Sequence, residues 1–98
     1  MSRVRFHRLA EAELYDAAHY YEKQAQGLGD ALLDEVWRGI EQILENPPAC
    51  PLVSANVRRK VLQRFPFNLM YRIEDNGALL ILAVMHQQRR PGYWQGRV

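Results

Sequence analysis

The residues of this chain best suited to chemistry or binding lie in the C-terminal tail, residues 86–97. The tail follows an apolar run that is typical of a buried strand. Its side chains can hold phosphates, stack on rings or bind an acidic partner. Its candidate residues are His86, Arg89, Arg90, Tyr93, Trp94 and Arg97. We therefore expect the functional surface to include this tail.

Each candidate in the tail also has a structural interpretation. His86 has the chemistry of a general base or acid, but a histidine at the end of a buried strand more often has a structural role. The arginines are either solvated surface charges or contacts to a partner. For Trp94 we favour packing over the edge of the sheet. His7 and His19 are weaker catalytic candidates, because one ends a strand and the other lies on a helix face.

The charge of the chain is unevenly distributed. Residues 1–50 contain five basic and nine acidic residues, a net charge of −4. Residues 51–98 contain eight basic and two acidic residues, a net charge of +6. A cationic half attracts polyanions or an acidic protein segment. The predicted binding residues of this half are Arg58, Lys60, Arg64, Arg72, Arg89, Arg90, Tyr93, Trp94 and Arg97.

Length and composition exclude several classes of protein. We expect residues 1–98 to form one domain, and no apolar run approaches the ~18 residues of a membrane span. The basic N-terminus lacks an apolar signal core and Cys50 is the only cysteine, so we expect a cytoplasmic protein without an internal disulfide. We find no metal-ligand spacing, P-loop or dinucleotide motif, and we predict neither metal nor cofactor.

The first half of the chain predicts a short strand and a helix. Residues 3–7 alternate polar and apolar side chains, as a strand with one buried face does. From Leu9 to Gln24, apolar residues recur every three or four positions, which predicts a helix. We expect Tyr20 and Tyr21 to pack this helix against a sheet.

A second helix follows the break at Gly27-Leu28-Gly29. Asp30 is its expected N-cap, and Asn46-Pro47-Pro48 ends it. The two apolar stripes, joined by a short loop, predict an antiparallel helical hairpin. The expected core residues of the second stripe include Leu33, Trp37 and Ile40.

The second half predicts three strands, at residues 57–62, 67–74 and 79–85. The second of these alternates and should be half buried, whereas the third is apolar on both faces and should lie centrally in the sheet. Asn76-Gly77 predicts a type I′ hairpin between them. In the first strand, alternation places Arg58 and Lys60 on one face and Arg59 and Val61 on the other.

This order of elements predicts an α+β domain of the form β-α-α-β-β-β. The helical hairpin should pack on one face of a mostly antiparallel four-stranded sheet. The other face of the sheet need not be covered, and Arg59, Asn68 and Arg72 are candidates to line it.

Several motifs in this order resemble the RelE/ParE superfamily of type II toxin–antitoxin toxins. The resemblance extends over nearly the whole chain. It is carried by Tyr20-Tyr21, Gly29, Asn46-Pro47, Val57-Arg58, Arg64-Phe65-Pro66-Phe67, Tyr71-Arg72-Ile73, Ile81–His86, Arg89-Arg90-Pro91 and Tyr93-Trp94.

The resemblance implies one of two activities. RelE-like members are ribosome-dependent messenger-RNA endonucleases that use basic residues on the strands and a C-terminal tyrosine. ParE-like members, which include plasmid stabilisation proteins, poison DNA gyrase and have no attributed hydrolytic centre. Both are neutralised by an antitoxin, expected to supply an acidic, amphipathic segment. Such a toxin can form a homodimer or a hetero-oligomer with its antitoxin, and the sequence leaves this open.

The positions that match the RelE-like pattern favour the ParE branch. Asn68 and Gln87 stand where that pattern places two arginines, and neither side chain replaces a bidentate cation. We therefore predict a toxin that inhibits growth by binding a macromolecule, with gyrase as the expected target. The alternative is a nuclease that uses Arg59, His86, Arg89 and Tyr93 on ribosome-bound RNA. A third interpretation is a non-toxic interaction module.

Overall fold

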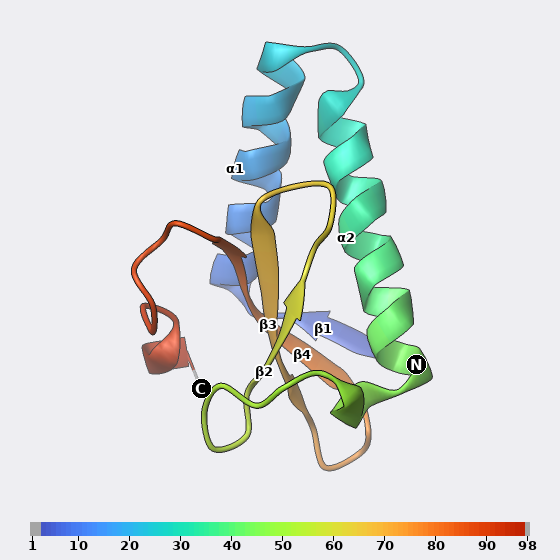
Figure 1. Ribbon diagram of the computed structural model, residues 1–98, viewed down its shortest axis with the longest axis vertical. Coiled ribbons are helices and arrows are strands. Elements are labelled where there is room, and N and C mark those ends of the chain that lie inside the picture. The colour runs from blue at the N-terminus through green and yellow to red at the C-terminus, as the bar shows by residue number, and fades with distance from the viewer. Residues whose placement is uncertain (1–2, 98) are drawn as a thin grey trace.

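The computed structural model describes residues 3–97 and has the predicted order of elements (Figure 1). Two helices are followed by three successive strands, and a short first strand precedes them. The α+β class is therefore confirmed. The elements are β1 (Val4–Phe6), α1 (Arg8–Gln24), α2 (Leu28–Glu45), β2 (Arg58–Val61), β3 (Phe67–Ile73) and β4 (Leu79–His86), with 3₁₀ turns at Pro47–Ala49 and Gln95–Arg97.

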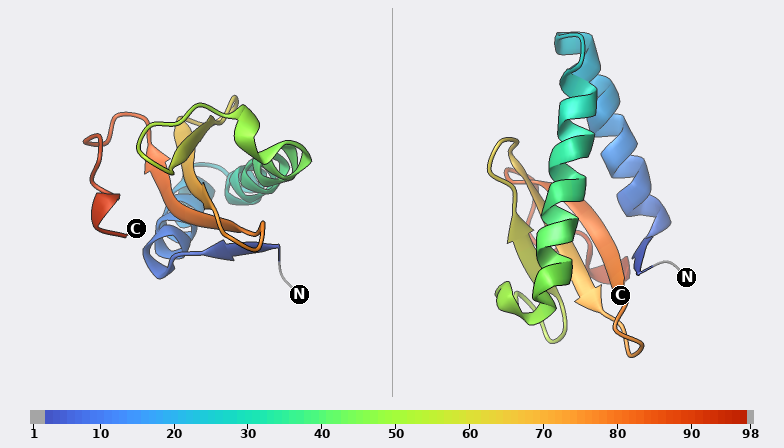
Figure 2. Two further views of the ribbon diagram at one scale, coloured as in Figure 1. Left: turned by 90° about the horizontal axis from the view of Figure 1, so that it is seen from below. Right: turned by 90° about the vertical axis from the view of Figure 1, so that its right-hand side faces the viewer.

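The four strands form one sheet in the order β1-β4-β3-β2. β4 is an interior strand, as predicted, and it pairs parallel with β1 and antiparallel with β3. β2 pairs antiparallel with β3, so the sheet is mostly antiparallel. The helical hairpin covers one face, and its closed end extends beyond the sheet (Figure 2).

The turn between the helices is capped by α1 rather than by Asp30, so the predicted N-cap is wrong. α2 begins at Leu28, and its N-cap is Gly27 with φ 85°. The Glu22 carboxylate accepts hydrogen bonds from the amides of Gly27 and Gly29, at 2.9 and 3.0 Å. These bonds lower the pKa of Glu22. A Cβ at Gly29 would lie 2.5 Å from the carbonyl oxygen of Ala18, so close contact between the helices requires glycine there.

The main core lies between the helices and the sheet, where Ile40 is buried as predicted. Trp37 is 49% exposed, which corrects its assignment to the core. It lies at the margin of the sheet, edge-on to Phe6 of the three-residue strand β1, and the sheet is too narrow there to cover it. Tyr21 packs against Phe65, but Tyr20 is 59% exposed, so only one of the two predicted tyrosine contacts forms.

The β3–β4 hairpin forms, but its turn is not type I′. Among the described residues only glycines have positive φ, and in this turn that residue is Gly77, with φ 84°. The Gly77 amide donates to the Glu74 carbonyl oxygen, and the Glu74 amide donates to the Ala78 carbonyl oxygen. One left-handed residue is enough for this three-residue turn, so Asn76 keeps negative φ.

β3 is buried on both faces from Phe67 to Tyr71, so its prediction as half buried is wrong. A second apolar cluster, which includes Met70, Met85 and Trp94, covers the face away from the helices. The tail supplies Trp94, which is 3% exposed, and so covers part of the face for which the sequence predicted no cover.

A bulge in β4 decides which way the end of this strand faces. Met70 pairs with Ala83, whereas Tyr71 pairs with Ile81, so Leu82 is the extra residue. Since side chains alternate along a strand, one extra residue reverses the faces of all that follow. His86 therefore lies beside Phe67 on the helix side.

Candidate functional site

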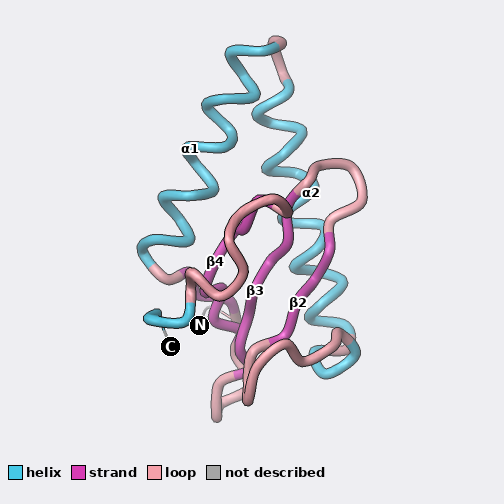
Figure 3. The backbone as a smooth tube through the Cα atoms, turned by 60° about the vertical axis from the view of Figure 1, so that its left-hand side comes forward, coloured by secondary structure: helices cyan, strands magenta, loops and turns pink. Residues whose placement is uncertain are grey.

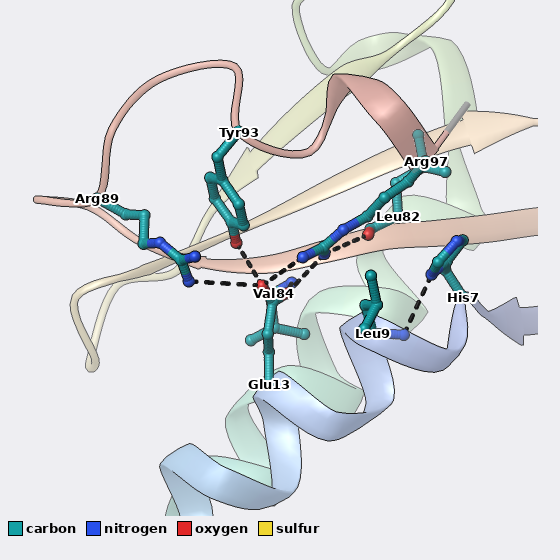
Figure 4. Close-up of polar contacts among 8 residues, drawn as sticks. All are labelled: His7, Leu9, Glu13, Leu82, Val84, Arg89, Tyr93 and Arg97. Atoms are coloured by element: carbon teal, nitrogen blue, oxygen red, sulfur yellow. Dashed lines mark hydrogen bonds and ion pairs between the residues drawn. The ribbon is translucent and has the colours of Figure 1, made fainter.

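The tail is fastened to the body of the protein by one carboxylate, that of Glu13 on α1 (Figure 4). Glu13 accepts two hydrogen bonds from the Arg97 guanidinium, at 3.0 and 2.9 Å, and one from the Tyr93 hydroxyl at 2.7 Å. Arg89 lies 3.7 Å from the same carboxylate. Glu13, Arg89, Tyr93 and Arg97 are called the Glu13 cluster below.

The Glu13 cluster completes an edge of the sheet that has no strand partner. β1 pairs with β4 only as far as Ile81. Beyond that point, the Val84 amide donates to Glu13 at 3.0 Å, and the Leu82 carbonyl oxygen accepts from Arg97 at 2.9 Å. Backbone groups that cannot reach water need such partners. The side chains of Glu13 and Arg97 are 16% and 11% exposed, so the pair is largely removed from solvent.

Tyr93 is held from two sides within the cluster. The Arg89 guanidinium carbon lies 3.9 Å from the centre of the ring, a cation–π contact. Burial and the hydrogen bond to Glu13 raise the pKa of Tyr93 above its usual range. The same carboxylate raises the pKa of Arg97. Tyr93 is therefore a neutral hydrogen-bond donor at physiological pH.

A cleft of about 430 Å³ lies between the tail and the sheet face on which Trp94 packs. Figure 3 shows the tail loop passing over the ends of β3 and β4 on this face. Asn68 is 8% exposed, and its side-chain oxygen accepts a hydrogen bond from Gln87 at 3.3 Å. We call this the sheet-face cleft. It is lined by Val53, Arg59, Asn68, Met70, Met85, Gln87, Pro91, Gly92, Trp94 and Gln95.

Arg59 is the only charged residue among those that line the sheet-face cleft. It pairs with Met70 across the strands, which places both on the face away from the helices. Its side chain is exposed and has no hydrogen-bond or ion-pair partner within residues 3–97. Arg90 is likewise exposed and unpaired within this range.

The other predicted binding residues do not form one surface with Arg59. Arg58 donates to the carbonyl oxygens of Pro48 and Cys50, at 2.9 and 2.7 Å, and so fastens the loop before β2. Arg72 pairs with Glu74 at 3.3 Å. Lys60 pairs with Leu69 on the helix side of the sheet.

Arg64, Trp94 and Arg97 differ in their access to solvent. Arg64 is exposed and lies 5.6 Å from the centre of the Phe65 ring. Trp94 packs against the sheet as we favoured, but on its face and not over its edge, and its burial in the second apolar cluster leaves little of it for a partner. Arg97 is committed to Glu13. The cationic half is therefore divided between structural cations and exposed ones.

The four candidate catalytic residues lie in three separate places. Arg59 lies at the sheet-face cleft, whereas Arg89 and Tyr93 belong to the Glu13 cluster. His86 is on the helix side, where its ring meets Phe67 edge-on and its Nδ1 accepts from the Gln88 amide at 3.1 Å. General acid–base catalysis requires such groups around one reacting phosphate.

Sequence reasoning missed Glu13, which holds the tail. An acidic residue in the first turns of a helix was explained by the helix dipole alone. Its partners are 71 to 84 positions away, and no local pattern signals them. The floor of the cleft was missed for a related reason, since Met70 and Met85 come together only through strand register.

Two kinds of feature are absent from residues 3–97. No helix there is long and apolar enough to cross a membrane. The same residues contain no group of three or more histidine, cysteine, aspartate or glutamate side chains placed to hold a metal ion.

Comparison with known proteins agrees with the fold and identifies the family. The family model described as "ParE toxin of type II toxin-antitoxin system, parDE" matches residues 4–91. The chain therefore belongs to the ParE toxin family. The match ends before Tyr93, Trp94 and Arg97.

One solved structure supports the architecture. It is described as the chromosomal ParDE toxin–antitoxin system from P. aeruginosa and is 22% identical to this chain, with a TM-score of 0.62. The alignment covers 88% of this chain and 96% of the other. No curated protein matches the chain.

Proposed function

We propose that this ParE-family protein inhibits growth by binding a macromolecular target, DNA gyrase, without cleaving RNA. The separation of Arg59, His86 and Tyr93 into three places carries this proposal. RNA cleavage by 2′-hydroxyl attack needs a base, an acid and a cation around the same phosphate. Three of the predicted binding residues or catalytic candidates, Arg59, Arg64 and Arg90, remain exposed without an ion-pair partner in residues 3–97 and are suited to binding.

Membership of the ParE family supports an antitoxin as the second partner. The chain carries a net charge of +2, with the excess of basic residues in its C-terminal half. An antitoxin that supplies an acidic, amphipathic segment complements that charge and neutralises the toxin. Growth arrest on expression of the toxin alone, relieved by co-expression of the cognate antitoxin, is the expected result. Normal growth on expression of the toxin alone would favour a non-toxic interaction module.

A supercoiling assay with purified gyrase tests the target directly. Inhibition that rises with toxin concentration is expected, and no inhibition at a large molar excess would contradict the proposal. Primer-extension mapping of transcripts after induction tests the alternative enzyme. Ribosome-dependent cuts in messenger RNA would replace gyrase binding with the endonuclease activity.

A further inference from the structure

We propose that the sheet-face cleft binds an acidic peptide segment of a protein partner. One carboxylate of the segment would pair with Arg59, and a neighbouring apolar side chain would lie against Val53 and Pro91, the exposed apolar residues that line the cleft. The inference rests on the proposed function, in which the toxin acts by binding a macromolecule, and it specifies the part of the toxin that contacts a protein partner. It concerns a different place from the Glu13 cluster, which is already occupied by the protein's own tail.

The charge in the cleft favours an anionic ligand. Of the ten residues that line it, Arg59 alone is charged, and none of these described residues is acidic. Arg59 has no partner in residues 3–97, in contrast to Arg58, Arg72 and Arg97. An exposed, unpaired guanidinium can bind a carboxylate with a charge-assisted, bidentate geometry.

The lining of the cleft favours a peptide over a nucleic acid. Met70 and Met85 pack with Trp94 beneath the cleft and are largely buried, whereas Val53 is 39% exposed and offers an apolar contact to a ligand. Nucleic-acid binding relies on several cations along the backbone and on exposed rings for stacking. Among the described lining residues there is one cation, and Trp94 is buried. Tyr93 is covered by Arg89 on one face and lies outside the cleft.

The amide pair supplies polar groups suited to a peptide backbone. The side-chain oxygen of Asn68 is used by Gln87, but the Asn68 amide nitrogen has no partner within the described residues. Gln87 also reaches the Phe67 carbonyl oxygen at 3.4 Å, so the pair is fixed to the end of β3. A carbonyl group of a bound segment can accept the free Asn68 donor. Arg59, Asn68 and Val53 thus give three contacts of different chemistry within one cleft.

A random peptide library displayed on phage and selected against the unmodified chain tests this inference. Enriched peptides should contain an aspartate or glutamate near a bulky apolar residue. Calorimetry with these synthetic peptides should show about tenfold or weaker binding to Arg59→Gln, as expected for loss of a charge-assisted contact. Arg8→Gln, which removes an exposed charge outside the cleft, is the matched control and should bind as the unmodified chain does.

Trp94 provides a reporter of where the peptides bind. Trp37 and Trp94 are the only tryptophans, so Trp37→Phe leaves Trp94 as the only one. Peptide binding should change the emission of Trp94 in this variant. Peptides without acidic bias, equal binding to Arg59→Gln, or failure to enrich any peptide would overturn the inference. Binding of a single-stranded RNA or duplex DNA oligonucleotide that depends on Arg59 and is tighter than binding of the peptides would also overturn the inference. The ligand of the cleft would then be a nucleic acid.

The supercoiling assay separates this inference from the proposed function. If gyrase is inhibited equally by the unmodified chain and by Arg59→Gln, and peptides do not bind the cleft, only the cleft assignment fails. If peptides bind as expected but gyrase is unaffected, the cleft assignment stands and gyrase as the target fails.

Discussion

Arg97 and Arg59 are both arginines of the cationic half, yet the fold uses them differently. Arg97 is 11% exposed in its side chain and makes a bidentate contact with Glu13. Arg59 is exposed and has no partner within residues 3–97. Residue type and net charge therefore do not identify a binding residue. The presence or absence of an internal acceptor, a carboxylate for Arg97 and backbone carbonyl oxygens for Arg58, separates cations that hold the fold from cations that are available to a partner.

The Glu13 cluster should give the largest loss of stability when it is broken. Glu13→Ala leaves the Arg97 charge and the Val84 amide without their acceptor. Removing one partner of a largely buried ion pair costs about 3–5 kcal/mol, so we expect a loss of that size in the free energy of unfolding. Urea denaturation measures it. Asp16→Ala, an exposed change on the same helix, is the control. Equal stability of the two variants would contradict a structural role for Glu13.

Tyr93→Phe should have a smaller effect of the same kind. The ring and its contact with Arg89 remain, and only the hydrogen bond to the Glu13 carboxylate is lost. Hydrogen bonds to charged groups contribute about 1.5 kcal/mol or more, and we expect a loss of about this amount in urea denaturation. A loss as large as that of Glu13→Ala would instead mean that Tyr93, and not the carboxylate, organises the tail.

Alkaline pH should weaken the Glu13 cluster without any substitution. The pKa of Tyr93 is raised in the folded protein, mainly by burial, whereas an unfolded tyrosine ionises near pH ~10. The unfolded chain therefore releases a proton that the folded chain keeps, and stability falls as pH rises above ~10.

Tyr93→Phe shows how much of the alkaline loss of stability comes from Tyr93 and how much from Tyr71, the other tyrosine with a raised pKa. Tyr71 is also shifted upward by burial, so part of the alkaline loss belongs to it. The fall in the urea midpoint above pH ~10 should be shallower in Tyr93→Phe than in the unmodified chain. Identical slopes in the two proteins would show that Tyr93 ionises normally in the folded state.

The smallest effect on stability is expected at the sheet-face cleft. Arg59→Gln removes an exposed charge without a partner, and such substitutions usually change the free energy of unfolding by less than about 0.5 kcal/mol. Urea denaturation should therefore not distinguish it from the unmodified chain. A clear destabilisation would place Arg59 with Arg97 among the structural cations.

The features predicted correctly from the sequence are those with a local signal. Alternation and helical periodicity predicted the order of elements, and the continuous apolar run predicted that β4 is an interior strand. The apolar stripe of α2 predicted Ile40 in the core but also Trp37, because a stripe does not show where the sheet ends. Family resemblance added the toxin class, which periodicity alone does not contain.

The features that could not be predicted depend on contacts between distant residues. The bulge at Leu82 places His86 on the helix side, and a run of apolar residues carries no sign of it. Glu13 has its function only because Tyr93 and Arg97 return to it. The predicted single cationic surface does not form for the same reason. Tertiary structure brings carboxylates to Arg72 and Arg97, and the sequence pattern does not show these pairs.

A titration of gyrase supercoiling with the unmodified chain and with the double variant Arg59→Gln/Arg90→Gln tests the central claim most directly. Both proteins should have the same free energy of unfolding, since both arginines are exposed and unpaired within residues 3–97. We predict that the unmodified chain inhibits supercoiling and that the double variant needs at least about tenfold more protein for the same inhibition. Equal inhibition by the two proteins, or none by the unmodified chain, would contradict the claim that the exposed cations bind the target.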